Sequence, residues 1–188
     1  TECRGVGCAR VTARSGDEYV VIARHRPRLG GLNENGPALG AGLGPVYAAD
    51  IVLASDNAVF GLPEIDIGLM GGARHTMTMF PKSLARRMIL TGYRAPAEEL
   101  YRRGIIEACV PLEKLMDEAM AMARIIAAKS PKALSLAKRA INTVEHMPLR
   151  DGYRFEQNLT VEMTRHEDSK EAMRAFVEKR PAVFKDTL

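Results

Sequence analysis

The sequence contains no tryptophan, and aromatic residues make up only 5% of its 188 residues. Stacking platforms for single-stranded nucleic acid depend on aromatic side chains, so this composition argues against such a function. Cysteine is scarce as well, since Cys3, Cys8 and Cys109 form no CxxC pair and lie in no histidine-rich spacing. We therefore expect no bound metal and a reduced compartment, which would place the protein in the cytoplasm.

Long hydrophobic runs are also missing. No apolar run approaches about 18 residues, the length of a membrane-spanning helix. The first residues contain no apolar segment typical of a signal peptide. We therefore expect neither a leader nor contact with a membrane.

The residues that are present have the composition of a folded protein, with 46% hydrophobic and 27% charged residues. The length allows one principal domain. The formal net charge is +4, and arginine is concentrated near the start, at Arg4, Arg10, Arg14, Arg24, Arg26 and Arg28. Such a basic segment could bind nucleic acid or another anion, but a solvated surface is the simpler interpretation, so no nucleic-acid partner is expected.

Residue patterns divide the chain into three parts. Residues 1–33 form an atypical basic head with one strand-like run, Tyr19 to Ala23. Residues 34–111 combine short buried strands over 50–55, 58–63 and 105–111 with helices over 83–92 and 95–104, the second with Pro96 in its first turn. Residues 112–188 are helical, with an amphipathic helix over 112–130 and further helices over 131–146, 149–164 and 168–179.

A glycine-rich stretch, GPALGAGLG over residues 36–44, stands out because it contains no acid or base. Its GxGxG pattern lacks the last glycine of a dinucleotide fingerprint, and the Gly-Lys-Ser/Thr ending of a phosphate loop is absent too. What remains is a turn of small residues that leads into a helix. The free N–H groups of such a turn could hold a developing negative charge, although a tight loop packed on a neighbouring element explains the glycines equally well.

Three separated blocks of the sequence resemble the crotonase superfamily, the enoyl-CoA hydratase and isomerase group. They are NGPALGAGLGPVYAADIVLASDNAVFGLPEIDIGLMGG, LTGYRAPAEELYRRGIIEACVP and EAMRAFVEKRPAVF, and they follow the family's order and spacing from about Asn35 to Phe184. The resemblance implies an α/β fold in which a partial spiral of ββα turns precedes a helical trimerisation region. It also implies an acyl-CoA substrate, of which coenzyme A is a part rather than a separate cofactor, and a homotrimer or dimer of trimers.

The resemblance also assigns roles to individual positions. The backbone N–H of Ala41 would be one of two donors to the thioester oxygen, and Glu64 would be an acid/base residue. Hydratases of the family have a second glutamate at the position of Gly44, so a one-base isomerase mechanism with Glu64 alone fits this sequence better than hydration. Asp66 could replace the missing acid if its segment is an extended strand, and His75 is another candidate, although capping or surface roles are the simpler interpretation for both.

The end and the beginning of the chain differ in how well they match the family. Phe176 and Lys179 match residues that contact coenzyme A, often that of a neighbouring subunit, while an ordinary exposed helix position is the alternative for Lys179. Residues 1–33 match no part of the segment that supplies the other oxyanion donor and much of the coenzyme A pocket. The alternative to an active enzyme is therefore an impaired remnant that binds coenzyme A or forms oligomers.

Overall fold

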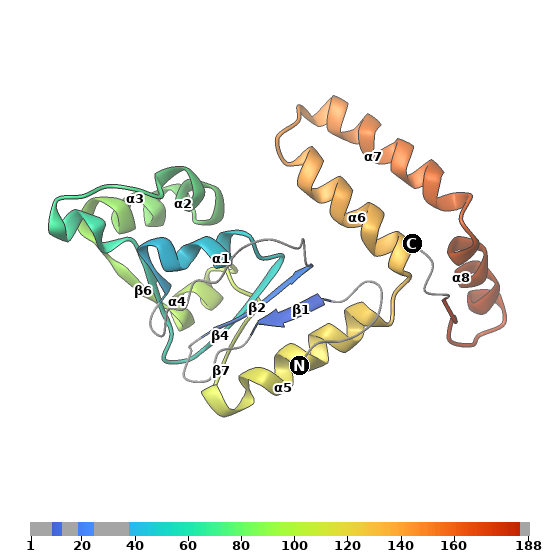
Figure 1. Cartoon of the computed structure of the whole chain (residues 1–188), viewed down its shortest axis with the longest axis horizontal. Coiled ribbons are helices and arrows are strands. Elements are labelled where there is room, and N and C mark those ends of the chain that lie inside the picture. Colours follow the sequence, from blue (N-terminus) through green and yellow to red (C-terminus); the bar gives the residue numbers. More distant parts are fainter. Residues whose placement is uncertain (1–8, 13–18, 25–37, 185–188) are drawn as a thin grey trace. The chain divides into compact units, whose positions relative to one another are not determined.

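The computed structural model describes residues 9–12, 19–24 and 38–184 (Figure 1). The described residues form two compact units, one within residues 9–123 and the other within residues 124–184. The division falls inside helix α5 (Leu112–Ala127), which begins where the sequence predicts the helical region to begin. No helix within these ranges is both long enough and apolar enough to cross a membrane.

Two small sheets form the framework of the first unit. The larger sheet has the order β1-β2-β4-β7, with strands β1 (Ala9–Thr12), β2 (Tyr19–Arg24), β4 (Ile51–Ser55) and β7 (Ala108–Val110). Its first two pairings are antiparallel and the pairing of β4 with β7 is parallel. The smaller sheet has the order β3-β5-β6, with strands β3 (Ala38–Leu39), β5 (Val59–Gly61) and β6 (Arg94–Pro96).

Short helices connect these strands. They are the 3-10 helices η1 (Gly40–Leu43) and η2 (Pro63–Ile67) and the α-helices α1 (Gly44–Tyr47), α2 (Ala73–Met79), α3 (Lys82–Thr91) and α4 (Ala97–Arg102). Gly92 and Gly104 follow α3 and α4 with φ of 64° and 67°, which confirms them as left-handed residues that end helices. The placement of Pro96 in the first turn of α4 was wrong, because Pro96 is extended, ends β6 and occupies the N-cap position just before the helix.

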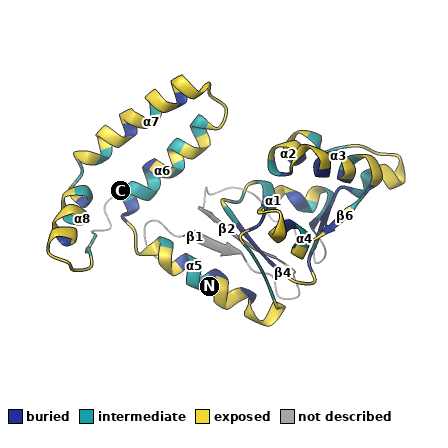
Figure 2. Cartoon of the chain, turned by 180° about the vertical axis from the view of Figure 1, so that it is seen from behind, coloured by how far each residue is buried: buried dark blue, intermediate teal, exposed yellow. Residues whose placement is uncertain are grey.

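The core of the first unit is a single cluster of buried apolar side chains. Buried positions are dark blue in Figure 2. Phe60 on β5 and Met88 on α3 are completely buried in it, and Leu43 brings the end of η1 into the same cluster. Full burial of a side chain of this size contributes roughly 1.5–3 kcal/mol relative to exposure. The core therefore fixes the glycine-rich turn against the two sheets.

The second unit is helical, as the sequence predicts. It contains the end of α5 and the helices α6 (Pro131–Val144), α7 (Leu149–Thr164) and α8 (Glu167–Val177), and α6 lies side by side with α7 (Figure 1). The bounds differ from the predicted ones by at most two residues.

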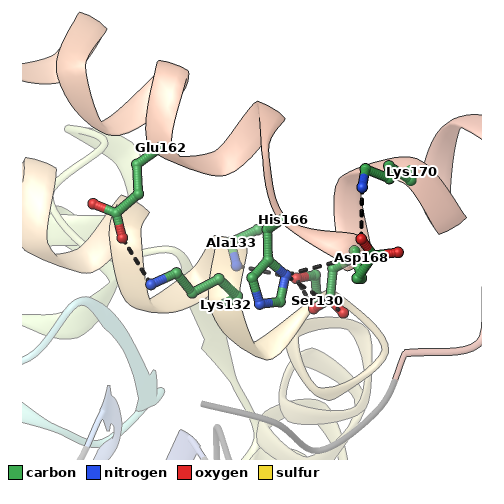
Figure 3. Close-up of polar contacts among 8 residues, drawn as sticks. Ser130, Lys132, Ala133, Glu162, His166, Asp168 and Lys170 are labelled. Atoms are coloured by element: carbon green, nitrogen blue, oxygen red, sulfur yellow. Dashed lines mark hydrogen bonds and ion pairs between the residues drawn. The ribbon is translucent and has the colours of Figure 1, made fainter.

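A polar cluster joins the starts of α6 and α8 (Figure 3). Ser130 caps α6 by accepting a hydrogen bond from the Ala133 N–H at 3.0 Å, and it donates its own proton to the buried Asp168 carboxylate at 2.5 Å. The ring of His166 caps α8 by accepting from the Asp168 N–H at 3.2 Å. A single hydroxyl thus serves two helices, because it acts as acceptor and donor at once.

Candidate active site

The glycine-rich turn presents Ala41 to an open cavity. Gly40 adopts φ of 57°, which turns the chain from the extended Leu39 into η1. Ala41 is the second residue of η1, and the N–H groups in the first turn of a helix have no intrahelical acceptor. Its side chain is a methyl group and the residue is exposed, so a ligand can approach the backbone closely.

Glu64 lies opposite this turn in the first turn of η2. Its carbonyl accepts a hydrogen bond from the Leu69 N–H at 2.9 Å, which holds the segment in a tight loop. The carboxylate packs directly on Gly40, because a Cβ added to that glycine would lie 2.6 Å from Glu64 Oε1. Within the described residues, Glu64 Oε2 is the one buried side-chain oxygen or nitrogen with no hydrogen-bond partner in the protein. A buried acceptor in this state is costly unless water or a ligand satisfies it.

These two residues line one cavity of about 700 Å³. A volume of this size is ordinary for a small-molecule site. The walls are mainly glycine and apolar side chains, and three polar side chains reach the cavity: Tyr47, Glu64 and His75. The structure thus brings Ala41, Glu64 and His75 to one cavity. Gly44 also lines this cavity and contributes no acid.

Tyr47 is a cavity residue that the sequence reasoning missed, and the buried Thr76 is its hydrogen-bond partner. The Tyr47 hydroxyl lies 2.7 Å from Thr76 Oγ1, and its ring stacks on the His75 ring with centroids 5.6 Å apart. Burial raises the pKa of the Tyr47 phenol, and the negative charge of Glu64 raises it further. The sequence could have pointed to Tyr47, because it follows Gly44 by one helical turn and so lies on the same side of the helix as the position where hydratases have their second glutamate.

Asp66 has a different environment from the one that an extended strand would give it. Residues 63–67 form the 3-10 helix η2 rather than a strand, so alternation does not place Asp66 beside Glu64. The Asp66 carboxylate lies against Gly92, where an added Cβ would come within 2.7 Å of Oδ1. Both acids nevertheless border a second, smaller cavity of about 350 Å³, which Arg94 also lines.

Phe176 and Lys179 lie near the end of α8 in the second unit, whereas the cavity is formed by the first unit. Phe176 is 84% exposed. Lys179 has φ of 54°, and the Arg180 N–H donates to the Ala175 carbonyl at 3.0 Å, so a lysine occupies the left-handed position that ends the helix. Their predicted contact with coenzyme A stays a prediction. Within the described part of the chain, no group of three or more histidine, cysteine or acidic side chains could hold a metal ion.

Comparison with known proteins gives the family of this site. Residues 33–187 match the family described as enoyl-CoA hydratase/isomerase. The chain is 39% identical over 155 residues to the mitochondrial enoyl-CoA hydratase of Pongo abelii, covering 81% of this chain and 53% of that protein. It is 40% identical over 144 residues to the (7aS)-7a-methyl-1,5-dioxo-2,3,5,6,7,7a-hexahydro-1H-indene-carboxyl-CoA hydrolase of Rhodococcus jostii strain RHA1, covering 77% of this chain and 56% of that one.

Solved structures agree with this relationship. The crystal structure of an enoyl-CoA hydratase/isomerase from Mycobacterium paratuberculosis matches with a TM-score of 0.76 and 32% identity, over 81% of this chain and 62% of that chain. The protein therefore has the crotonase fold and belongs to the enoyl-CoA hydratase/isomerase family. The chain spans a little over half the length of these relatives.

Proposed function

We propose that this chain acts on acyl-CoA thioesters as an enoyl-CoA hydratase/isomerase-type enzyme, with Glu64 as the acid/base residue. The observation that supports this most directly is Glu64 Oε2, a buried carboxylate oxygen without a partner that borders a cavity lined by Ala41. A bound acyl group with an acidic C–H beside its carbonyl would give that oxygen its missing partner.

The proposed chemistry divides between these two residues. Glu64 removes the proton next to the thioester carbonyl, and the electron pair moves into the carbonyl to form an enolate. The Ala41 N–H donates to the enolate oxygen, and loss of one such donor typically costs about 10²–10³ in rate. Glu64 then returns its proton, either to the same carbon or to the carbon at the far end of the shifted double bond.

Because Gly44 supplies no second carboxylate, this site is limited to reactions that Glu64 can complete alone or with another kind of group. Proton removal and return need only Glu64, so double-bond isomerisation is accessible with a single base. Addition of water needs a further group that orients the water. With Glu64 as the one carboxylate that lines the larger cavity among the described residues, isomerisation is better supported than hydration.

In this proposal, the second unit binds coenzyme A and mediates assembly of the enzyme. Phe176 and Lys179 are the proposed contacts to the adenine and phosphate groups of coenzyme A. Exposed apolar side chains on these helices, including Leu149 at 90% exposure, favour assembly with further copies of the chain as a homotrimer or dimer of trimers.

Replacement of Glu64 tests this proposal. The purified chain and Glu64→Gln would be incubated with 2-butenoyl-CoA and with 3-butenoyl-CoA, and the products separated by chromatography. We expect the variant to lose about 10²–10⁴ in rate, the usual contribution of a positioned acid/base group. Glu118→Gln, at an exposed position of α5, is the matched control and should keep full activity. Equal rates for the original chain and Glu64→Gln, or no turnover above buffer by the original chain, would refute the proposal.

A further inference from the structure

Tyr47 lines the cavity, and the direction of one hydrogen bond shows what its hydroxyl can still donate or accept. Thr76 has a single hydroxyl proton, and it donates this proton to the Gly72 carbonyl at 2.9 Å. The 2.7 Å contact between Tyr47 and Thr76 must therefore use the proton of Tyr47, with Thr76 Oγ1 as acceptor. The Tyr47 hydroxyl then has no further proton to donate, but the lone pairs of its oxygen can still accept a hydrogen bond.

Neighbouring groups hold this oxygen in place. Thr76 is fully buried and fixed to Gly72 at the start of α2, so it is a rigid acceptor. The His75 ring stacks on the Tyr47 ring with an angle of 20° between their planes, which restricts the tyrosine from the side. The cavity that Tyr47 lines also contains Glu64, and burial together with the negative charge of Glu64 raises the pKa of the phenol, which keeps it protonated. An ordered hydrogen-bond acceptor, the Tyr47 oxygen, thus belongs to a residue that lines the same cavity as Glu64.

We propose that Tyr47 positions the water that adds to an enoyl thioester in this site, and so performs a task for which Gly44 provides no side chain. This inference rests on the proposed function, because it assigns a water-binding group to the same acyl-CoA site. It makes hydration available to an enzyme with a single carboxylate.

The step balances with Glu64 and Tyr47 alone. One water proton is held in a hydrogen bond to the Tyr47 oxygen, and the other faces Glu64. The water oxygen forms a bond to the β-carbon as Glu64 takes that second proton, and the electron pair of the carbon–carbon double bond moves into an enolate. Glu64 then delivers the proton to the α-carbon, and Tyr47 keeps its own proton throughout.

Two assays on the full chain separate water addition from proton transfer. Hydration is followed as loss of 2-butenoyl-CoA absorbance. Proton transfer alone is followed by mass spectrometry as exchange of the α-hydrogens of butanoyl-CoA in deuterium oxide, a reaction that adds no water. For Tyr47→Phe we expect hydration to fall by about tenfold or more, the effect of one lost hydrogen bond in the transition state, while exchange stays within about twofold.

Companion variants separate a positioning role from a structural one. Thr76→Val should lower hydration in the same selective way, and the double variant should be no slower than Tyr47→Phe, because the two residues act as one unit. Tyr101→Phe, on the exposed surface of α4, is the control and should change neither rate. Unfolding curves recorded for each variant identify any that is not folded.

Each remaining outcome decides against one of the two proposals. If Tyr47→Phe hydrates at the original rate, or if hydration and exchange fall together, the role of Tyr47 is refuted. If the original chain exchanges α-hydrogens but never hydrates, the role of Tyr47 is refuted and the proposed function stands. If Glu64→Gln exchanges as fast as the original chain, the proposed function itself fails.

Discussion

Replacing Gly40 by alanine would test whether the turn and the carboxylate must lie in direct contact. The new Cβ would lie 2.6 Å from Glu64 Oε1, whereas ordinary van der Waals contact begins at 3.4 Å. The carboxylate or the turn must therefore move by roughly 0.8 Å. A displacement near 1 Å at a reacting group can cost about 10²-fold in rate, so we expect a loss of that order in turnover.

The same substitution also has a cost in stability. Gly40 has φ of 57°, and an alanine in the left-handed region costs about 1–2 kcal/mol. Gly104 supplies the matched control, because it has φ of 67° but no heavy atom within 4 Å of an added Cβ. Gly104→Ala should therefore lose a similar amount of unfolding free energy and keep its activity.

The assay combines urea unfolding with turnover of 2-butenoyl-CoA and 3-butenoyl-CoA. Gly40→Ala and Gly104→Ala should have similar unfolding free energies, so a difference in their turnover reports on the contact between the turn and Glu64. If Gly40→Ala and Gly104→Ala have the same turnover, contact between the turn and Glu64 does not matter to catalysis, and the geometric reasoning is wrong.

Two further predictions concern the second unit. Ser130→Ala removes the cap of α6 and the hydrogen-bond donor to buried Asp168, so we expect urea titration to show a loss of about 1–3 kcal/mol in unfolding free energy. The control, Ser83→Ala at an exposed position, should change the unfolding free energy little. Equal losses for the two variants would contradict the role of the polar cluster. Hydrogen bonds from Arg180 and the Val183 N–H lower the pKa of Glu171 from 4.5 to about 2, so its contribution is complete above pH 4.5 and disappears as the pH falls towards 2. Glu171→Gln should remove this part of the acid sensitivity in urea midpoints measured over that range, and parallel pH profiles for both proteins would contradict it.

The sequence allowed most of the secondary structure to be predicted, because glycine, proline and apolar spacing mark the ends and faces of the helices. Gly92 and Gly104 end helices where expected, and the strand predicted at 50–55 is β4. The segment around Glu64 was harder, because a short run such as PEIDI fits a strand and a 3-10 turn alike. The pairing of β2 with β4 is a contact between distant residues, which local patterns do not encode.

The site was predicted only in part. Ala41 and Glu64 were found through resemblance to a family, and their shared cavity is a property of the folded chain. Tyr47 was missed because a tyrosine in a short helix reads as core, and its importance depends on Thr76, which lies 29 residues further along the chain. The contact of Asp66 with Gly92 likewise depends on how η2 packs on the end of α3.

Glu64 borders both the larger cavity, of about 700 Å³, and the smaller one, of about 350 Å³. An acyl chain that fills the first would leave the second as a separate approach to the same carboxylate. In the proposed reaction, hydrogen taken up by Glu64 would then exchange with hydrogen of bulk solvent before the product departs. An isotopic label removed from the substrate would consequently be diluted in the medium instead of being carried intact to another carbon.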